Sequence, residues 1–190
     1  THTCALQGAD VLACWGAAQL GQTGLGGGMG PCMLSPHERT ECDPEPRFIF
    51  PERSWHGVAV GDGHTCARDV NGDVLCFGAN YQAQLGRSAA CVSETGDPVF
   101  CDWTDTPVLL SSETEVVAAG GSTTCRRSGD TLTCFGEGRF GQRGNGYPDT
   151  QDDPDRPAEL PPPPRGRWDS VAVGADHTCA VSSEGDLACF

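Results

Sequence analysis

Short runs of alternating apolar and polar residues, separated by glycine-containing turns, recur along the chain. The run HTCAR begins at His64 and the run DVLCF begins at Asp73, and Val70-Asn71-Gly72 lies between them. A period of two is typical of half-buried β-strands, and a glycine in the intervening turn predicts a β-hairpin. We therefore expect a mostly β protein that is built from hairpins.

The hairpin pattern occurs four times, and the first cysteines of successive copies lie 62, 59 and 54 residues apart. This period predicts one supersecondary unit per repeat within a single array over residues 1–190. In the third copy the two cysteines are one residue closer together, and we expect this deletion to lie in the turn. The predicted hairpins cover residues 1–16, 63–78, 122–136 and 176–190.

A second phrase follows the first three hairpins, and it opens with an aromatic residue and a glycine. Its aromatic residues are predicted to pack onto a neighbouring unit; they are Trp15, Phe77 and Phe135. Its glutamines are predicted to brace turns, with a ligand-binding row as the alternative; they are Gln22, Gln84 and Gln142.

Each repeat also contains two further short strands. Outer strands are predicted to open at prolines, which a strand tolerates at its first residue or at an edge; these are Pro46, Pro107 and Pro157. Another strand leads into the next hairpin. Each repeat therefore has about four strands, which is the content of a propeller blade.

The last repeat carries the sequence Val171-Ala172-Val173-Gly174, then His177-Thr178-Cys179-Ala180 and Gly185, and the first carries Trp15-Gly16 and Gly21-Gln22. At these residues the chain resembles the regulator of chromosome condensation repeat family. The resemblance implies an all-β fold, a partial β-propeller of about 3.5 blades, in a family whose propellers usually have seven. Cysteines are not part of the family's intracellular pattern, so the resemblance points to secreted, bacterial-type relatives. Guanine-nucleotide exchange is not carried over.

All 12 cysteines fall into pairs that enclose eight or nine residues. An even number with no residue left over favours disulfides and an extracellular or cell-surface location, with the periplasm as an alternative. Structural zinc is the competing interpretation, but the chain has no Cys-x2-4-Cys spacing. Four pairs are predicted to join hairpin strands and two to brace loops. The pairs are Cys4–Cys14, Cys32–Cys42, Cys66–Cys76, Cys91–Cys101, Cys125–Cys134 and Cys179–Cys189.

The formal net charge of −14 argues against nucleic-acid binding, which requires a basic surface. The chain has no lysine, so Schiff-base and P-loop chemistry is excluded within it. No apolar run approaches the ~20 residues that span a bilayer. The first and last residues interrupt the repeat at almost the same phase. We therefore expect further repeats, or other copies of the chain, to stack on both ends.

Histidines recur at one position of the repeat, at His2, His64 and His177, whereas a catalytic histidine normally occurs once. We interpret them as core residues that hydrogen-bond the backbone. The single histidines His37 and His56 are even weaker candidates for a catalytic group. No nucleophile elbow, HExxH or dinucleotide motif is present, so we predict a non-enzyme, although a hydrolase or lyase site could be assembled across blades.

Acidic clusters are the other chemical candidates. Four carboxylates form a weak calcium candidate; they are Asp149, Asp152, Asp153 and Asp155. Two further clusters are interpreted as solvated loops; they contain Glu41, Asp43, Glu45, Asp102 and Asp105. No cofactor is required by the sequence.

Three long variable loops are the best candidates for binding, because recognition residues concentrate on ordered loops of rigid scaffolds. They cover residues 25–53, 87–115 and 143–167. The favoured function is an extracellular interaction or structural scaffold, which binds a protein or copies of itself through loops or chain ends and could form a filament. The alternatives are a secreted inhibitor of an extracellular enzyme and a carbohydrate-active enzyme.

Overall fold

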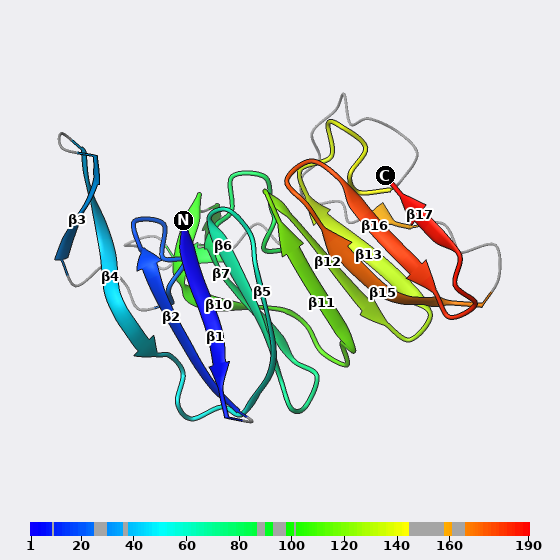
Figure 1. Ribbon diagram of the computed structural model, residues 1–190, viewed down its shortest axis with the longest axis horizontal. Helices are drawn as coiled ribbons and strands as arrows, with labels where there is room; N and C mark the ends of the chain where they lie inside the picture. Colours follow the sequence, from blue (N-terminus) through cyan, green and yellow to red (C-terminus); the bar gives the residue numbers. More distant parts are fainter. Residues whose placement is uncertain are drawn as a thin grey trace.

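The computed structural model describes residues 1–8, 10–24, 30–35, 38–86, 90–92, 98–100, 102–144, 158–160 and 166–190. Within these ranges the chain is all β and has no helix. Four antiparallel sheets follow one another along the long axis of the molecule in chain order (Figure 1). The sequence therefore predicted the fold class correctly.

The two middle sheets are complete four-stranded blades. Blade 2 has the order β5 (Trp55–Val60), β6 (His64–Asp69), β7 (Val74–Ala79) and β10 (Trp103–Ser111). Blade 3 has the order β11 (Val116–Gly120), β12 (Thr123–Ser128), β13 (Thr131–Gly136) and β14 (Ala158–Glu159). The first strands, β5 and β11, lie against each other, and we call this side of the array the inner edge.

Each end sheet lacks one strand of this plan within the described residues. Blade 1 has no inner strand and consists of β1 (His2–Gln7), β2 (Val11–Ala17), β4 (Glu38–Phe48) and an additional β3 (Gly30–Ser35). Blade 4 has no outer strand and consists of β15 (Trp168–Val173), β16 (Thr178–Ser182) and β17 (Leu187–Cys189). A separate pair, β8 (Ala90–Val92) and β9 (Pro98–Phe100), completes the list. The array corresponds to the predicted partial propeller.

The hairpin cysteines lie directly opposite each other in all four blades. In blade 2 the turn is closed by Asp69, whose Oδ1 accepts hydrogen bonds from the backbone N–H groups of Asn71 and Asp73, and Gly72 has a φ of 89°. In blade 3 Ser128 pairs with Thr131, so the turn has two residues. The deletion thus lies in the turn, where it leaves the facing cysteines in register.

Five disulfides are present in the described part of the chain. Four join facing hairpin residues with a Cα–Cα distance of 4.1 Å; they are Cys4–Cys14, Cys66–Cys76, Cys125–Cys134 and Cys179–Cys189. The fifth, Cys32–Cys42, connects β3 to β4, so it braces a pair of strands where the sequence predicted a loop. The expected Cys91–Cys101 pair involves residue 101, which lies outside the described residues.

The outer strands differ from the prediction in one respect. Pro46 and Pro107 lie inside β4 and β10, not at their first residues. Both strands are irregular near the proline: the pairing of β4 with β2 shifts between Cys14 and Gly16, and that of β10 with β7 shifts between Thr104 and Val108. An outer strand can accommodate proline at such an irregularity because a regular ladder hydrogen bond is not required there.

Candidate interaction surfaces

Successive side chains of each hairpin strand point to opposite faces of the blade, so every blade has two different faces. In blade 2, Cys66 and Cys76 pack in one cluster with Phe135 of blade 3, whereas Ala67 and Phe77 pack in another with residues of blade 1. We call the side that faces the next blade the forward face and the side that faces the preceding blade the backward face. The hairpin disulfides therefore lie on the forward faces.

Three junctions are formed when a forward face meets the next backward face. At junction 1–2 the fully buried Trp55 packs beside Cys14, and at junction 3–4 Trp168, which is 2% exposed, packs beside Cys134. At junction 2–3 the position eleven residues before the hairpin cysteine is Thr114, so no tryptophan is present there. The junctions share the disulfide and differ in what surrounds it.

The predicted aromatic anchors are buried where a preceding blade covers them. Phe77 is fully buried and Phe135 is 6% exposed, each on a backward face that a preceding blade covers. Trp15, at the same position of blade 1, is half-buried. The prediction that this residue packs onto a neighbouring unit is therefore confirmed at Phe77 and Phe135.

Two of the recurring histidines, His2 and His64, are buried as predicted, but they contact the next blade through a side chain, so the predicted bond to the backbone is wrong for them. His177 is exposed, so the prediction that it is a core residue is wrong. His2 Nε2 lies 2.7 Å from Thr65 Oγ1, and His64 Nε2 lies 2.8 Å from Thr124 Oγ1. The Thr65 hydroxyl donates to the carbonyl oxygen of Gln22 at 2.9 Å. Because its proton is used in that bond, Thr65 accepts from His2, which is therefore the neutral Nε2–H tautomer.

Burial keeps both linking histidines neutral. Loss of hydration, together with the smaller effect of the nearby His2, lowers the pKa of His64 from 6.5 to about 3. Burial lowers the pKa of His2 to about 4, and the N-terminal ammonium group acts in the same direction. Protonation of either ring would place a charge in a junction, so both histidines are neutral, structural hydrogen-bonding residues near neutral pH.

The third junction lacks this link. Thr123 stands in the place of histidine, and Thr178, which corresponds to Thr65 and Thr124, is fully buried. Its Oγ1 has no hydrogen-bond partner among the residues that the structure describes. The sequence pattern signals this difference, since His-Thr becomes Thr-Thr in one of four copies, but it does not show that each histidine bonds to the following repeat.

The forward face of blade 4 is exposed. Leu187 is 68% exposed, although its counterparts in blades 1 to 3, which are Leu12, Val74 and Leu132, are at most 1% exposed. Val181 is 36% exposed, and Cys189 and His177 are also exposed. This face is therefore an apolar junction surface without a covering blade in the structure.

The backward face of blade 1 is its counterpart at the other end. Thr3, Ala5 and Gln7 are exposed along β1, and Val11 is 37% exposed at the start of β2. Thr3 occupies the position of Thr65, the residue that accepts the hydrogen bond from His2. The two ends of the array thus present the two unlike halves of a junction.

The glutamines of the second phrase brace turns, as predicted. The side-chain Oε1 atoms of Gln22, Gln84 and Gln142 accept hydrogen bonds from the backbone N–H groups two residues earlier, at 2.8 to 2.9 Å. All three side chains are at most 2% exposed. They are therefore structural and do not form an accessible ligand-binding row.

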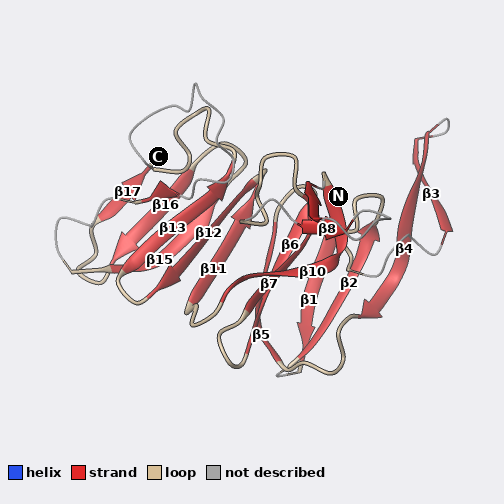
Figure 2. Ribbon diagram, turned by 180° about the vertical axis from the view of Figure 1, so that it is seen from behind, coloured by secondary structure: helices blue, strands red, loops and turns tan. Residues whose placement is uncertain are grey.

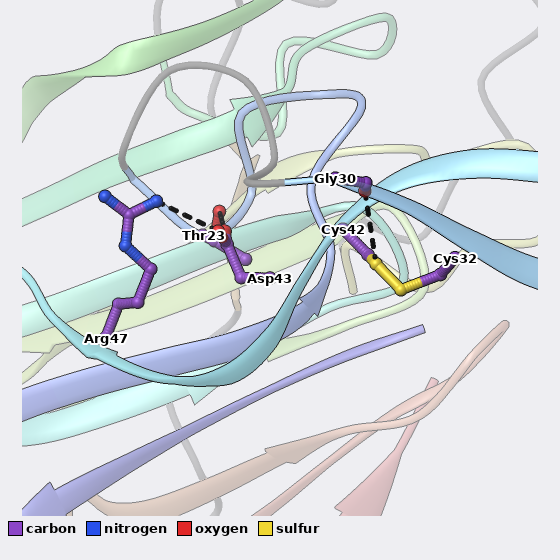
Figure 3. A network of polar contacts seen from close by, with 6 residues as sticks. All are labelled: Thr23, Gly30, Cys32, Cys42, Asp43 and Arg47. Carbon is purple, nitrogen blue, oxygen red and sulfur yellow. Dashed lines mark hydrogen bonds and ion pairs between the residues drawn. A yellow bond between two sulfur atoms is a disulfide. The ribbon is translucent and has the colours of Figure 1, made fainter.

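Asp43 departs from its predicted role as a solvated loop residue. It is fully buried, and its carboxylate accepts from Thr23 Oγ1 at 2.7 Å and from Arg47 Nη1 at 3.0 Å (Figure 3). Cys42, the neighbouring residue, carries the disulfide to Cys32. A buried charge requires such partners, so this network fixes the middle of β4 against the glycine-rich turn that contains Thr23.

The other predicted site residues are not gathered by the structure. Glu41, Glu45, Asp102 and the single histidine His56 are exposed, and Asp105 is half-exposed. The calcium candidates Asp149, Asp152, Asp153 and Asp155, together with His37, lie outside the described residues. Where side chains are described, no three His, Cys, Asp or Glu residues form a metal-binding group. Nor does that part of the chain contain a helix that is long and apolar enough to cross a membrane.

Comparison with known proteins identifies the repeat. Two sequence models of the regulator of chromosome condensation (RCC1) repeat match, one at residues 55–84 and the other at residues 131–181. No curated protein matches the chain in sequence. The first match covers the hairpin of blade 2, and the second runs from β13 of blade 3 into β16 of blade 4.

Solved structures share the fold. Human WBSCR16 is 18% identical with a TM-score of 0.72, over 100% of this chain and 44% of that chain. Prp20p from Saccharomyces cerevisiae is 22% identical with a TM-score of 0.68, over 100% and 43%. The ectodomain of the Physcomitrella patens receptor kinase CR4 is 17% identical with a TM-score of 0.51, over 100% and 38%. The chain spans less than half the length of each. The chain thus contains RCC1 repeats at residues 55–84 and 131–181 and shares the β-propeller fold of these structures.

Proposed function

We propose that this chain is a non-catalytic protein-interaction scaffold that works in an oxidising, extracellular compartment. The observation that carries the proposal is the propeller of RCC1-type repeats, which match at residues 55–84 and 131–181. On the outer strand β10 the apolar side chains of Trp103 and Leu109 are 44% and 46% exposed. Exposed apolar side chains on a rigid scaffold favour a protein partner over a small molecule.

The cysteines support the proposed compartment. The ten cysteines of the five described disulfides leave no free thiol in that part of the chain. Such a density of disulfides is typical of secreted proteins and rare in the cytosol. The similar propeller of CR4 stands in a receptor ectodomain, and Prp20p is described as binding Gsp1p and histones. A propeller of this kind is thus compatible with both parts of the proposal.

A second candidate function is inhibition of an extracellular enzyme, and the β3–β4 pair favours it. This pair projects from the first sheet at the end of the array (Figures 1 and 2). Its strands are joined by Cys32–Cys42, and the buried Asp43 anchors its base. A braced projection loses little conformational entropy on binding, which suits insertion into a partner's cleft.

Site-specific photo-crosslinking tests the scaffold proposal. A photoreactive residue is placed at Leu109 on the outer strand β10 or, as a control, at the exposed Asp130 in the turn of blade 3. The chain is exposed to the extracellular proteins of its source, and each captured protein is identified, purified and titrated by calorimetry. Saturable binding of a protein captured only from position 109 supports the proposal. Capture of no protein, or turnover of polysaccharides in a substrate panel, would contradict it.

A further inference from the structure

We infer that the outer edge of blade 2 binds an arginine side chain of a partner protein. The binding surface consists of Tyr81, Asp102 and Trp103, and we call it the acidic aromatic patch. The guanidinium group of the partner stacks on an exposed ring of the patch and forms an ion pair with the Asp102 carboxylate. The inference rests on the proposed scaffold function and names the chemistry of the partner.

Two backbone contacts bring the residues of the patch together. Trp103, the first residue of β10, pairs directly with Ala79, the last residue of β7. The backbone N–H of Asn80 donates a hydrogen bond to the carbonyl oxygen of Asp102 at 2.7 Å. Tyr81 is the next residue after Asn80. The two aromatic residues and the carboxylate therefore lie at one end of the β7–β10 pair.

The side chains of the patch are accessible in the middle of the array. Tyr81 is 51% exposed, Trp103 is 44% exposed, and Asp102 is also exposed. Blade 2 packs against blade 1 on one face and against blade 3 on the other, so this exposure belongs to the outer edge of a blade that is flanked on both sides. A partner can reach the patch without displacing either neighbouring blade.

The turn that carries Tyr81 is held in place by buried groups. The backbone N–H of Ala83 donates to the carbonyl oxygen of Asn80 at 3.0 Å, and Gln84 Oε1 accepts from the backbone N–H of Gln82 at 2.9 Å. Asn80 and Gln84 are at most 2% exposed. A surface that is fixed before binding loses little conformational entropy when it binds a partner.

Blade 3 shows that this fold can hold a guanidinium group between a ring and a carboxylate. Arg139 occupies the position of Tyr81 in the phrase that follows the hairpin. Its Cζ atom lies 5.0 Å from the centroid of the Phe140 ring, and its Nε atom forms an ion pair with Glu137. The two interactions act together on one cation. The patch of blade 2 has two rings and a carboxylate, but tyrosine replaces the arginine.

Charge complementarity specifies a basic partner. Every charged side chain between Arg87 and Arg126 is acidic, so the segment that carries Asp102 and Trp103 supplies no cation of its own. The net charge of −14 also attracts a basic partner at long range. Arginine fits the patch better than lysine, because its planar guanidinium group stacks on a ring and still donates hydrogen bonds to a carboxylate.

Calorimetric titration with short peptides tests the inference without an identified partner. The first probe is an acetylated, amidated peptide of four alternating glycine–arginine pairs. Its two counterparts contain lysine or citrulline in place of arginine, and citrulline keeps the shape of arginine without the charge. At about 0.15 M salt, which screens long-range attraction, the arginine peptide should bind about threefold more tightly than the lysine peptide. The citrulline peptide should show no measurable binding.

Variants of the patch locate the bound peptide. Trp103→Leu removes a ring without changing the charge and should weaken binding of the arginine peptide about fivefold, and Tyr81→Leu should weaken it about threefold. Asp102→Asn should weaken it about threefold. The matched control Asp130→Asn removes the same charge from the exposed turn of blade 3 and should leave the affinity unchanged. An unchanged circular dichroism spectrum verifies the fold of each variant.

Three results would overturn the inference. The first is a wild-type chain that does not bind the arginine peptide. The second is an equal loss of affinity in Asp102→Asn and Asp130→Asn, with none in Trp103→Leu and Tyr81→Leu, since that pattern indicates general attraction by charge. The third is a protein captured through position 109 that binds the triple patch variant as tightly as the wild-type chain, which would leave the scaffold function intact. Peptide binding at the patch without any captured protein would support its arginine specificity and contradict only the scaffold function.

Discussion

Junctions 2–3 and 3–4 bury the same disulfide face by different means. At junction 2–3 a histidine reaches across to a threonine, and Thr114 takes the place of a tryptophan. At junction 3–4 Trp168 is present, the histidine is replaced by Thr123, and the hydroxyl of Thr178 has no partner in the described structure. Junction 1–2 has both the tryptophan and the histidine. All three junctions thus contain the disulfide face. The tryptophan is missing from junction 2–3, and the histidine is missing from junction 3–4.

The largest loss of stability should come from removing a disulfide. Comparing a buried with an exposed disulfide distinguishes the contribution of the crosslink from that of packing at the junction. Cys66–Cys76 is fully buried at junction 2–3, whereas Cys189 of the Cys179–Cys189 pair is exposed; both have a sequence separation of 10. Replacing both cysteines by alanine should cost about 3 kcal/mol in blade 4, from the freed unfolded chain alone. In blade 2 it should cost about 5 kcal/mol, because a cavity is added.

Urea unfolding of the two double variants, at concentrations where the chain is monomeric, measures these costs. The exposed pair serves as the control for the buried one. Equal losses in the two variants would show that the crosslink contributes everything and the buried sulfur atoms contribute nothing to the junction.

The next largest loss of stability should come from removing the tryptophan of junction 3–4, which junction 2–3 lacks. Trp168→Ala should lower the free energy of unfolding by about 4 kcal/mol, because a buried aromatic side chain is removed from junction 3–4. Thr114→Ala, at the same position of junction 2–3, should cost about 1 kcal/mol, since it removes only a small side chain and the hydroxyl contact with Ser111. Chemical denaturation of both variants measures the difference. Similar losses in the two variants would contradict the claim that Trp168 stabilises junction 3–4 more than Thr114 stabilises junction 2–3.

Acid should affect the junctions that contain histidine. His64 has a pKa of about 3 in the folded chain and 6.5 when unfolded, so the unfolded state binds the additional proton between these values. Its contribution is therefore complete above pH 6.5 and is lost progressively as the pH falls toward 3. Between pH 7 and pH 5 this residue alone should lower the free energy of unfolding by about 2 kcal/mol.

Denaturant titrations at a series of pH values, on the wild-type chain and His64→Gln, isolate this contribution. The variant removes the ionisable group, so its stability should fall less steeply from pH 7 to pH 5. Parallel curves would mean that His64 does not titrate differently in the two states.

The smallest effects should have opposite signs. Thr178→Val removes a buried hydroxyl that lacks a partner in the described structure, and it should stabilise the chain by about 1 kcal/mol. Thr124→Val removes the hydroxyl that is hydrogen-bonded to His64 Nε2 and should destabilise the chain by about 1 to 2 kcal/mol. Calorimetric melting of both variants gives the signs. A stabilised Thr124→Val would show that the histidine link contributes nothing.

The repeat and its hairpins could be predicted because their signals are local. Residues facing across a turn, such as Cys125 and Cys134, are set by strand alternation and turn length, so the missing residue could be placed correctly. The histidine bonds could not be predicted in the same way, because His2 and Thr65 are 63 positions apart. Their contact depends on how one blade stacks on the next, which no pattern within a single repeat specifies.

The outer strands of the blades are predicted less well, because their structure depends on contacts that are distant in the sequence. The prolines inside β4 and β10 lie at irregularities of strand pairing, which the sequence does not reveal, so it predicts strand starts there. The sequence also predicts a solvated Asp43, because its neighbours Glu41 and Glu45 are acidic. Its burial depends on Thr23, in a turn 20 residues earlier, and on Arg47.

Each of the five described disulfides closes a pair of strands inside one blade, and none of them joins two blades. Mechanical tension along the chain would therefore act first on the junctions, which are held without covalent bonds. Once the blades separate, the segment between each bonded cysteine pair is bypassed by its crosslink and cannot lengthen. A stretched chain would give way in steps, blade from blade, and would stop well short of full extension until a reductant released the hairpins.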